Sequence, residues 1–160
     1  MENWFALRVR SNFEQTTYTI LRRKGYEELL PTYRRRMRLP GHYGEAPLFP
    51  GYVFARFDPQ VRLPILMTPG VVHIVGAGKT PEPLADDEIR NIRRIAASKV
   101  AAQPWPFTKI GQRITIQKGS LEGVEGLLLK VKNRRRLVAS ITMLQRSVAV
   151  EIDDDWVRPV

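Results

Sequence analysis

Cysteine is absent from the 160-residue sequence, and histidine occurs only twice, at His42 and His73. The absence of cysteine excludes disulfide bonds and cysteine-ligated metal sites, and it fits a protein of the reducing cytoplasm. His42 lies in a stretch rich in proline and glycine, whereas His73 lies in an apolar stretch farther along the chain. Neither a phosphate-binding GxxxxGK[ST] motif nor a GxSxG motif occurs. We therefore expect no metal, no cofactor and no enzymatic activity.

Long apolar runs are also missing from the sequence. No run of about 18 apolar residues is present, and the start of the sequence lacks a basic stretch followed by an apolar core. We therefore expect a protein that is neither secreted nor inserted in a membrane. The hydrophobic fraction of 43% is nevertheless that of a folded globular protein.

Positive charge is present in excess, with 26 Lys and Arg against 16 Asp and Glu and a net charge of +10. Such a balance predicts attraction to polyanions, and it does not by itself separate nucleic acids, ribosomes and membrane surfaces as partners. Two basic clusters stand out: Arg34–Arg36 with Arg38, and Arg134–Arg136 with Lys130 and Lys132. For each cluster, contact with phosphates and protection of an exposed strand edge are both open. The acidic runs Asp86–Glu88 and Asp153–Asp155 are interpreted as a helix cap and a solvated turn.

The first part of the chain mixes strand and helix patterns. Apolar and polar residues alternate or β-branched residues cluster in 4–10, 49–57 and 71–75, which predicts strands. The spacing of Ser11 and Glu14 is that of a capping box, which predicts a helix that ends at Gly25. A brief helix is expected within 61–67, and a third helix with a buried isoleucine stripe is expected to begin near Asp86. The fold class is therefore α+β, with an antiparallel sheet and flanking helices.

The carboxyl-terminal part of the chain has a period of two. Ile114 and Ile116 open a series of four or five short strands that ends at Ile152, with glycines between them. This pattern predicts a small closed β-barrel. The segment from Gln103 to Thr108 is the best linker candidate, because its prolines lack amide donors and disfavour helix before them. We thus expect domains at residues 1–103 and 109–160, joined by a linker at 104–108.

Four aromatic residues lie between Phe49 and Phe57. Side chains alternate between the two faces of a strand, so Tyr52 and Phe54 share one face while Phe49, Val53 and Phe57 take the other. We predict that Tyr52 and Phe54 are at least partly exposed and form a protein-binding patch. Burial of this pair under a helix is the alternative that periodicity leaves open.

Several motifs together resemble the NusG-type transcription elongation factors over nearly the whole length. The amino-terminal motifs are Trp4–Leu7, Pro47–Phe54 and Thr68–Val72, the last of which precedes Gly76–Gly78. In the second half, Ile110–Ile114 and Gly119–Gly126 resemble the KOW motif, in which Gly119, Gly123 and Gly126 turn the chain between barrel strands. The resemblance implies an amino-terminal NusG domain followed by a small SH3-like KOW β-barrel.

This resemblance also implies a function, namely a monomeric, non-enzymatic regulator of transcription elongation and antitermination in the cytoplasm. Its amino-terminal domain would bind the clamp region of RNA polymerase through Phe49, Pro50, Tyr52 and Phe54, and would favour the pause-resistant state. Four arginines are candidates for contact with upstream or non-template DNA: Arg8, Arg10, Arg22 and Arg23. The KOW domain would recruit a small-subunit ribosomal protein or the termination factor Rho. The alternative is a ribosome-associated RNA-binding protein, since KOW barrels also occur in large-subunit ribosomal proteins.

Within this family, Leu144–Glu151 and the exit through Trp156 resemble the specialised paralogues of the RfaH and capsule-operon antiterminator kind. Arg62–Pro64 stands where RfaH-type proteins carry a His-Thr-Thr contact. In RfaH the carboxyl-terminal half can also form a helical hairpin. Here the alternating β-branched pattern from Arg113 to Ile152 predicts the barrel instead.

Overall fold

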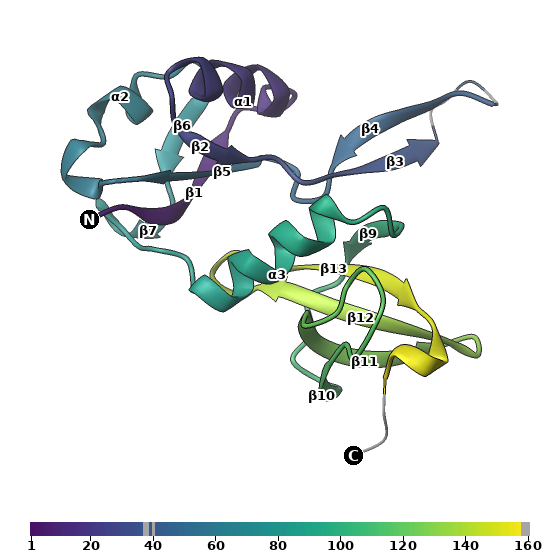
Figure 1. The fold of residues 1–160 in the computed structure, drawn as a ribbon. Helices are drawn as coiled ribbons and strands as arrows, with labels where there is room; N and C mark the ends of the chain where they lie inside the picture. The colour runs from purple at the N-terminus through teal and green to yellow at the C-terminus, as the bar shows by residue number, and fades with distance from the viewer. Residues whose placement is uncertain (37–38, 40, 158–160) are drawn as a thin grey trace. The chain divides into compact units, whose positions relative to one another are not determined.

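The computed structural model describes residues 1–36, 39 and 41–157, and its fold class is α+β as expected (Figure 1). The chain divides into two compact units, which are described separately. The first unit comprises Met1–Thr32 and Phe49–Asp86, and the second comprises Tyr33–Leu48 and Asp87–Val160. This division differs from a boundary at residue 103. Whether 1–103 and 109–160 fold as independent domains stays a prediction.

An antiparallel four-stranded sheet forms the centre of the first unit, in the order β2-β5-β1-β6. Its strands are β1 (Asn3–Val9), β2 (Glu27–Leu29), β5 (Tyr52–Phe57) and β6 (Val71–Ile74). Two helices belong to this unit, α1 (Glu14–Arg23) and the short α2 (Leu63–Leu66), which follows the 3-10 turn Pro59–Val61. A small hairpin pairs β7 (Gly76–Ala77) with β8 (Thr80–Pro81). The strands expected at 4–10 and 71–75 and the brief helix within 61–67 are thus confirmed.

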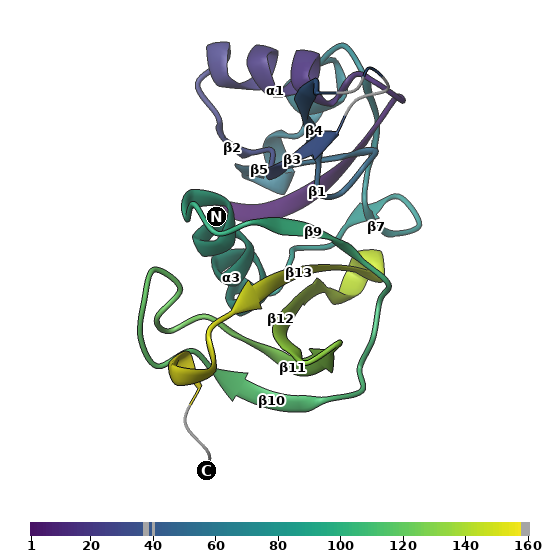
Figure 2. The same cartoon turned by 90° about the vertical axis from the view of Figure 1, so that its right-hand side faces the viewer.

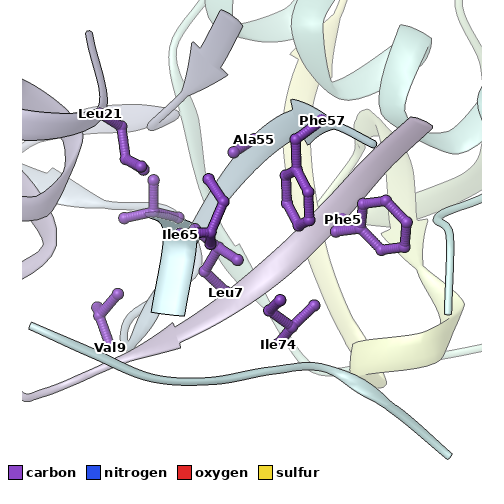
Figure 3. Close-up of a cluster of buried hydrophobic side chains, with 9 residues drawn as sticks. Phe5, Leu7, Val9, Leu21, Ala55, Phe57, Ile65 and Ile74 are labelled. Atoms are coloured by element: carbon purple, nitrogen blue, oxygen red, sulfur yellow. The ribbon is translucent and has the colours of Figure 1, made fainter. Parts of the chain in front are cut away.

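The core of the first unit lies between the sheet and its two helices (Figure 3). Leu21 from α1 and Ile65 from α2 pack on apolar side chains from one face of the sheet. The strand residues of this cluster are Phe5, Leu7, Val9, Val53, Ala55, Phe57 and Ile74. The rings of Phe5 and Phe57 lie 4.7 Å apart between centroids. Helices α1 and α2 therefore cover this face of the sheet, and the other face carries the even-numbered residues of β1 and β5.

Helix α1 ends as expected but begins differently. Gly25 follows its last turn with φ of +89°, a conformation that glycine adopts without strain. The residue before its first turn is Phe13, which makes no side-chain capping bond, so the capping box expected from Ser11 and Glu14 is wrong. The carboxylate of Glu14 instead accepts a hydrogen bond from the amide of Gly51.

Helix α3 and a five-stranded antiparallel sheet make up most of the second unit. The helix spans Asp86–Ala97, and the sheet order is β10-β11-β12-β13-β9. The strands are β9 (Ala102–Trp105), β10 (Gln112–Thr115), β11 (Glu125–Val131), β12 (Arg134–Ile141) and β13 (Arg146–Ile152), with 3-10 turns at Thr142–Leu144 and Asp154–Trp156. The sheet curls on itself as a small barrel does (Figure 2). The prediction that this region is β rather than helical is confirmed.

A hairpin of β3 (Thr32–Arg36) and β4 (Tyr43–Pro47) completes the second unit. Arg38, one of the basic residues singled out in the sequence, lies outside the described residues.

The segment expected as a linker is partly a strand. Gln103, Pro104 and Trp105 belong to β9, in which Pro104 pairs with Val148 of β13. β9 lies at the edge of the sheet, where a proline without an amide donor is tolerated. The expectation of a linker is therefore wrong for these three residues, and only the loop after them connects β9 to β10.

Polar side chains of α3 hold the helix against the barrel strands within the second unit. Glu88 accepts hydrogen bonds from both the amide and the hydroxyl of Thr142. The carboxamide oxygen of Asn91 accepts from the amide of Glu125 at 3.2 Å, and Arg94 donates to the carbonyl of Glu122 at 2.7 Å. These bonds come from positions three residues apart, which lie on one side of a helix. The adjacent stripe of α3, with Ile89, Ile92 and Ile95, is buried as expected.

Candidate functional site

A tight turn precedes β5 and presents Pro50 to solvent. The amide of Tyr52 donates to the carbonyl of Phe49 at 3.0 Å, and Gly51 has φ of +87°. The carbonyl of Gly51 accepts from the amide of Val9 at 2.8 Å, and its amide donates to Glu14 at 3.3 Å. These bonds fix the turn to both β1 and α1, so Pro50 is held on a rigid support.

Arg8 lies against this turn on the face of the sheet that α1 and α2 leave free. Arg8 and Tyr52 are directly opposite each other on β1 and β5, and the guanidinium carbon lies 5.1 Å from the centre of the tyrosine ring. This is the geometry of a cation–π contact. The guanidinium also occupies the space that a side chain at Gly51 would need. On the next strand, the exposed His73 pairs with Arg8.

The four residues proposed for protein binding differ in exposure. Pro50 is exposed and Tyr52 is half-buried, whereas Phe49 and Phe54 are 1% and 0% exposed. The rings of Phe49 and Phe54 meet edge to face at 5.4 Å. The expectation that Phe54 is exposed is therefore wrong.

The expectation that Phe49 shares a strand face with Val53 and Phe57 is also wrong. Strand β5 begins only at Tyr52, so the turn breaks the alternation and places Phe49 with Phe54 instead of Val53 and Phe57.

The four arginines proposed for contact with DNA are all exposed, but the structure does not gather them on one surface. Arg8 lies beside Tyr52 on the face of the sheet opposite to α1 and α2. Arg10 follows the end of β1, where its amide donates to the carbonyl of Gly70. Arg22 and Arg23 lie in the last turn of α1, the helix that covers the other face of the sheet.

Acidic neighbours pair with the basic cluster at Arg134–Arg136. Glu151 binds Arg134 at 3.1 Å and Arg136 at 3.4 Å, and Asp154 binds Arg135 at 3.3 Å. For Arg134 and Arg135, the contacts therefore favour a structural role at the sheet surface over free phosphate binding.

The acidic runs have structural partners as well. Asp155 lies 3.0 Å from Lys118, whose hydrogen bond and positive charge lower the pKa of that carboxyl below its ordinary value. Glu88, in the acidic run at the start of α3, accepts a hydrogen bond from the amide of Thr142. Over residues 1–36, 39 and 41–157, no three His, Asp or Glu side chains come together as a metal site. In the same part of the chain, no helix is long and apolar enough to cross a membrane.

The three glycines of the KOW motif serve different local needs. Gly119 and Gly123 have φ of +90° and +88° in the loop between β10 and β11. Gly126 lies in β11, where an added Cβ would come within 2.5 Å of the carbonyl oxygen of Val138 and 2.9 Å of a Leu137 methyl group. Close approach of β11 and β12 therefore requires glycine at this position.

An antiparallel sheet covered by helices, followed along the chain by a small curled β-sheet, defines an α+β fold. The family model for "transcription termination factor nusG" matches residues 2–93, which is more than half of the chain. The chain belongs to the NusG family.

Individual members of this family show how far the similarity extends. The transcription termination/antitermination protein NusG of Thermus thermophilus is 28% identical over 117 residues, which cover 66% of this chain and 64% of that protein. NusG of Helicobacter pylori strain 26695 is 23% identical over 172 residues, which cover 95% of each chain. A solved structure that concerns domain interaction in Thermotoga maritima NusG has a TM-score of 0.62 at 20% identity, covers 100% of this chain and supports the fold.

Family membership decides the class of function. Members of the NusG family are transcription factors, so this chain is a transcription termination/antitermination factor and not an enzyme. The specialised-paralogue assignment stays a prediction. Sequence reasoning missed Glu14, Gly51 and His73, which fix or flank the turn. The strand register, which pairs Arg8 with both Tyr52 and His73, reveals His73. The hydrogen bond from the amide of Gly51 to the carboxylate of Glu14 reveals the other two.

Proposed function

We propose that this chain binds the clamp region of RNA polymerase through the surface that carries Pro50, Tyr52 and Arg8. The observation that supports this most is the rigid turn at 49–52, which holds an exposed proline and a half-buried tyrosine beside an arginine. Aromatic and arginine side chains are the residues that most often carry binding energy at protein interfaces. A preformed turn also reduces the entropy lost on binding.

Phe49 and Phe54 are buried and support this surface without forming part of it. Their edge-to-face contact lies directly beneath the turn and next to Tyr52 in β5. Deeply buried rings make few direct contacts with a partner in this conformation, so their proposed role is to fix the position of Pro50 and Tyr52. All four residues first proposed for polymerase binding thus remain part of the proposal, in two different roles.

The proposed mechanism is stabilisation of the pause-resistant state of the polymerase. A bound factor shifts a conformational equilibrium only by the difference between its affinities for the two states. Arg8 and Arg10 would contact upstream or non-template DNA at the edge of the bound surface. Arg22 and Arg23 would reach DNA only from the α1 side of the first unit. The factor would act as a monomer, in the cytoplasm, wherever transcription takes place.

The barrel would recruit a second partner, either a small-subunit ribosomal protein or Rho. An exposed apolar residue in the loop before β10, Ile110, is 82% exposed and offers an anchor for such a partner. Family membership favours this proposal over the alternative of a ribosome-associated RNA-binding protein, because relatives of this chain are transcription factors.

Pause duration of purified RNA polymerase tests the proposal directly. Addition of the full chain to elongation complexes halted at a defined pause site is expected to shorten the pause, and the effect should saturate with concentration. The matched control is the same chain after heat denaturation. An unchanged pause at concentrations that saturate any observed binding would contradict the proposal.

A further inference from the structure

A basic groove runs across the second unit, between β3 of the hairpin and strands β9 and β13 of the barrel. It encloses about 430 Å³. Its charged lining consists of Arg34, Arg35, Arg36 and Arg136 with Glu151, which gives a net charge of +3. None of its lining residues belongs to the turn at 49–52, and the groove has no role in the polymerase contact proposed above.

Arg136 is held rigidly on the barrel side of this groove. Its guanidinium carbon lies 5.0 Å from the centre of the Trp105 ring, and one terminal nitrogen donates to Glu151 at 3.4 Å. The Nε–H of Arg136 is buried and has no acceptor among the described residues. A buried donor without an acceptor is unfavourable.

The hairpin side of the groove provides the unneutralised charge. Arg34 stacks on the ring of Tyr43, with its guanidinium carbon 4.6 Å from the ring centre. Arg35 and Arg36 are exposed, and neither forms an ion pair with any residue in the described part of the chain. Arg134 and Arg135, by contrast, are paired with acidic side chains. The two walls therefore differ. On the barrel side Arg136 is fixed by its acidic and aromatic neighbours, whereas on the hairpin side Arg35 and Arg36 are free to bind an anion.

We propose that this groove binds the backbone phosphates of a single-stranded nucleic acid. Guanidinium groups match phosphate oxygens in two-point hydrogen bonds, and here they approach from two walls. Arginines interleaved with aromatic rings, in this case Tyr33 in the lining and Trp105 and Tyr43 beneath two of the arginines, are typical of surfaces for single strands.

Fluorescence anisotropy with the purified full chain and no polymerase tests this site. The probes are a labelled oligouridine of about 12 nucleotides, its deoxy counterpart and a duplex of equal length. The variant Arg35→Glu with Arg36→Glu is expected to bind single strands at least about tenfold more weakly. Loss of two phosphate contacts should also reduce the slope of log K against log salt concentration by about 1.4.

A control variant with the same change in net charge separates the groove from general electrostatics. Lys79→Glu with Arg90→Glu alters two exposed residues outside the groove and should leave the salt slope unchanged. A second variant, Arg136→Lys, keeps the charge but removes the Nε–H and the planar fork, and it should weaken binding severalfold. Because Arg35 and Arg36 are exposed, the hairpin variant should keep the thermal midpoint of the parent chain.

Specific outcomes would overturn the proposal. These are an equal loss of affinity in the control variant, duplex binding as tight as single-strand binding, or displacement of the oligonucleotide by a polyglutamate peptide at equal charge concentration. A preference for the ribose or the deoxyribose strand supports the site in either case and identifies which nucleic acid it takes. Pausing experiments do not enter this test, so its failure would leave the polymerase proposal standing.

Discussion

Replacement of Tyr52 by alanine is expected to weaken binding of the chain to RNA polymerase about 30-fold, which corresponds to about 2 kcal/mol. The ring is half-buried and stacked under Arg8, so its removal takes away both an aromatic contact and the support of a cationic side chain. Competition between labelled parent chain and unlabelled variant for the polymerase measures this loss.

Phe13→Ala is the matched control for this prediction. Phe13 is also a partly exposed aromatic residue of the first unit, at 38% exposure, but it precedes α1 and takes no part in the turn. Polymerase affinity should stay within about threefold of the parent for this variant. An unchanged affinity for Tyr52→Ala in a folded chain would remove Tyr52 from the proposed surface.

Replacement of Phe54 by alanine is expected to lower the free energy of unfolding by about 3–5 kcal/mol. The side chain is fully buried, and its ring packs edge to face on Phe49 beneath the turn. A loss of this size is a large part of the stability of an ordinary domain, which is about 5–15 kcal/mol. Urea denaturation followed by circular dichroism measures the change.

Phe54→Leu provides the comparison for the alanine variant. It keeps most of the apolar volume and is expected to cost well under half as much as the alanine variant. A loss below about 1 kcal/mol for Phe54→Ala would mean that the ring is accessible in solution. In that case Phe54 would regain the direct contact with polymerase that the family resemblance implies.

Most of the architecture was predictable because long periodic segments carry a strong signal. The isoleucine stripe of α3 and the alternation in the barrel strands depend on many residues, so no single local exception changes the pattern. The turn at Lys132 and Asn133, both with positive φ, closes the β11–β12 hairpin.

Single local interactions were not predictable in the same way. Glu14 has the correct spacing for a capping box, yet the amide of Gly51 is its partner, and that contact joins segments far apart in the sequence. At Phe49, one glycine with positive φ two residues later moves the ring to the other face of the sheet. Pro104 in β9 shows the same effect, because a proline that disfavours helix is compatible with an edge strand.

The candidate site could be predicted only in part from the family resemblance and the alternation of side chains. The partial exposure expected for Tyr52 is confirmed, but the burial of Phe54 depends on tertiary packing that a period of two does not specify. The partnership of Arg8 with Tyr52 depends on strand register, which is set by the core residues on the opposite face.

Site-specific photocrosslinking from position 50 tests the central claim most directly. Pro50 is exposed and part of a rigid turn, so a photoreactive residue there should not disturb the core. The same residue at Gln15, which is exposed on α1 at the other face of the sheet, is the control. We expect crosslinks from position 50 to the largest subunits of transcribing polymerase, and few from position 15. Equal yields from the two positions, or none from position 50 while the chain still shortens pauses, would contradict this account.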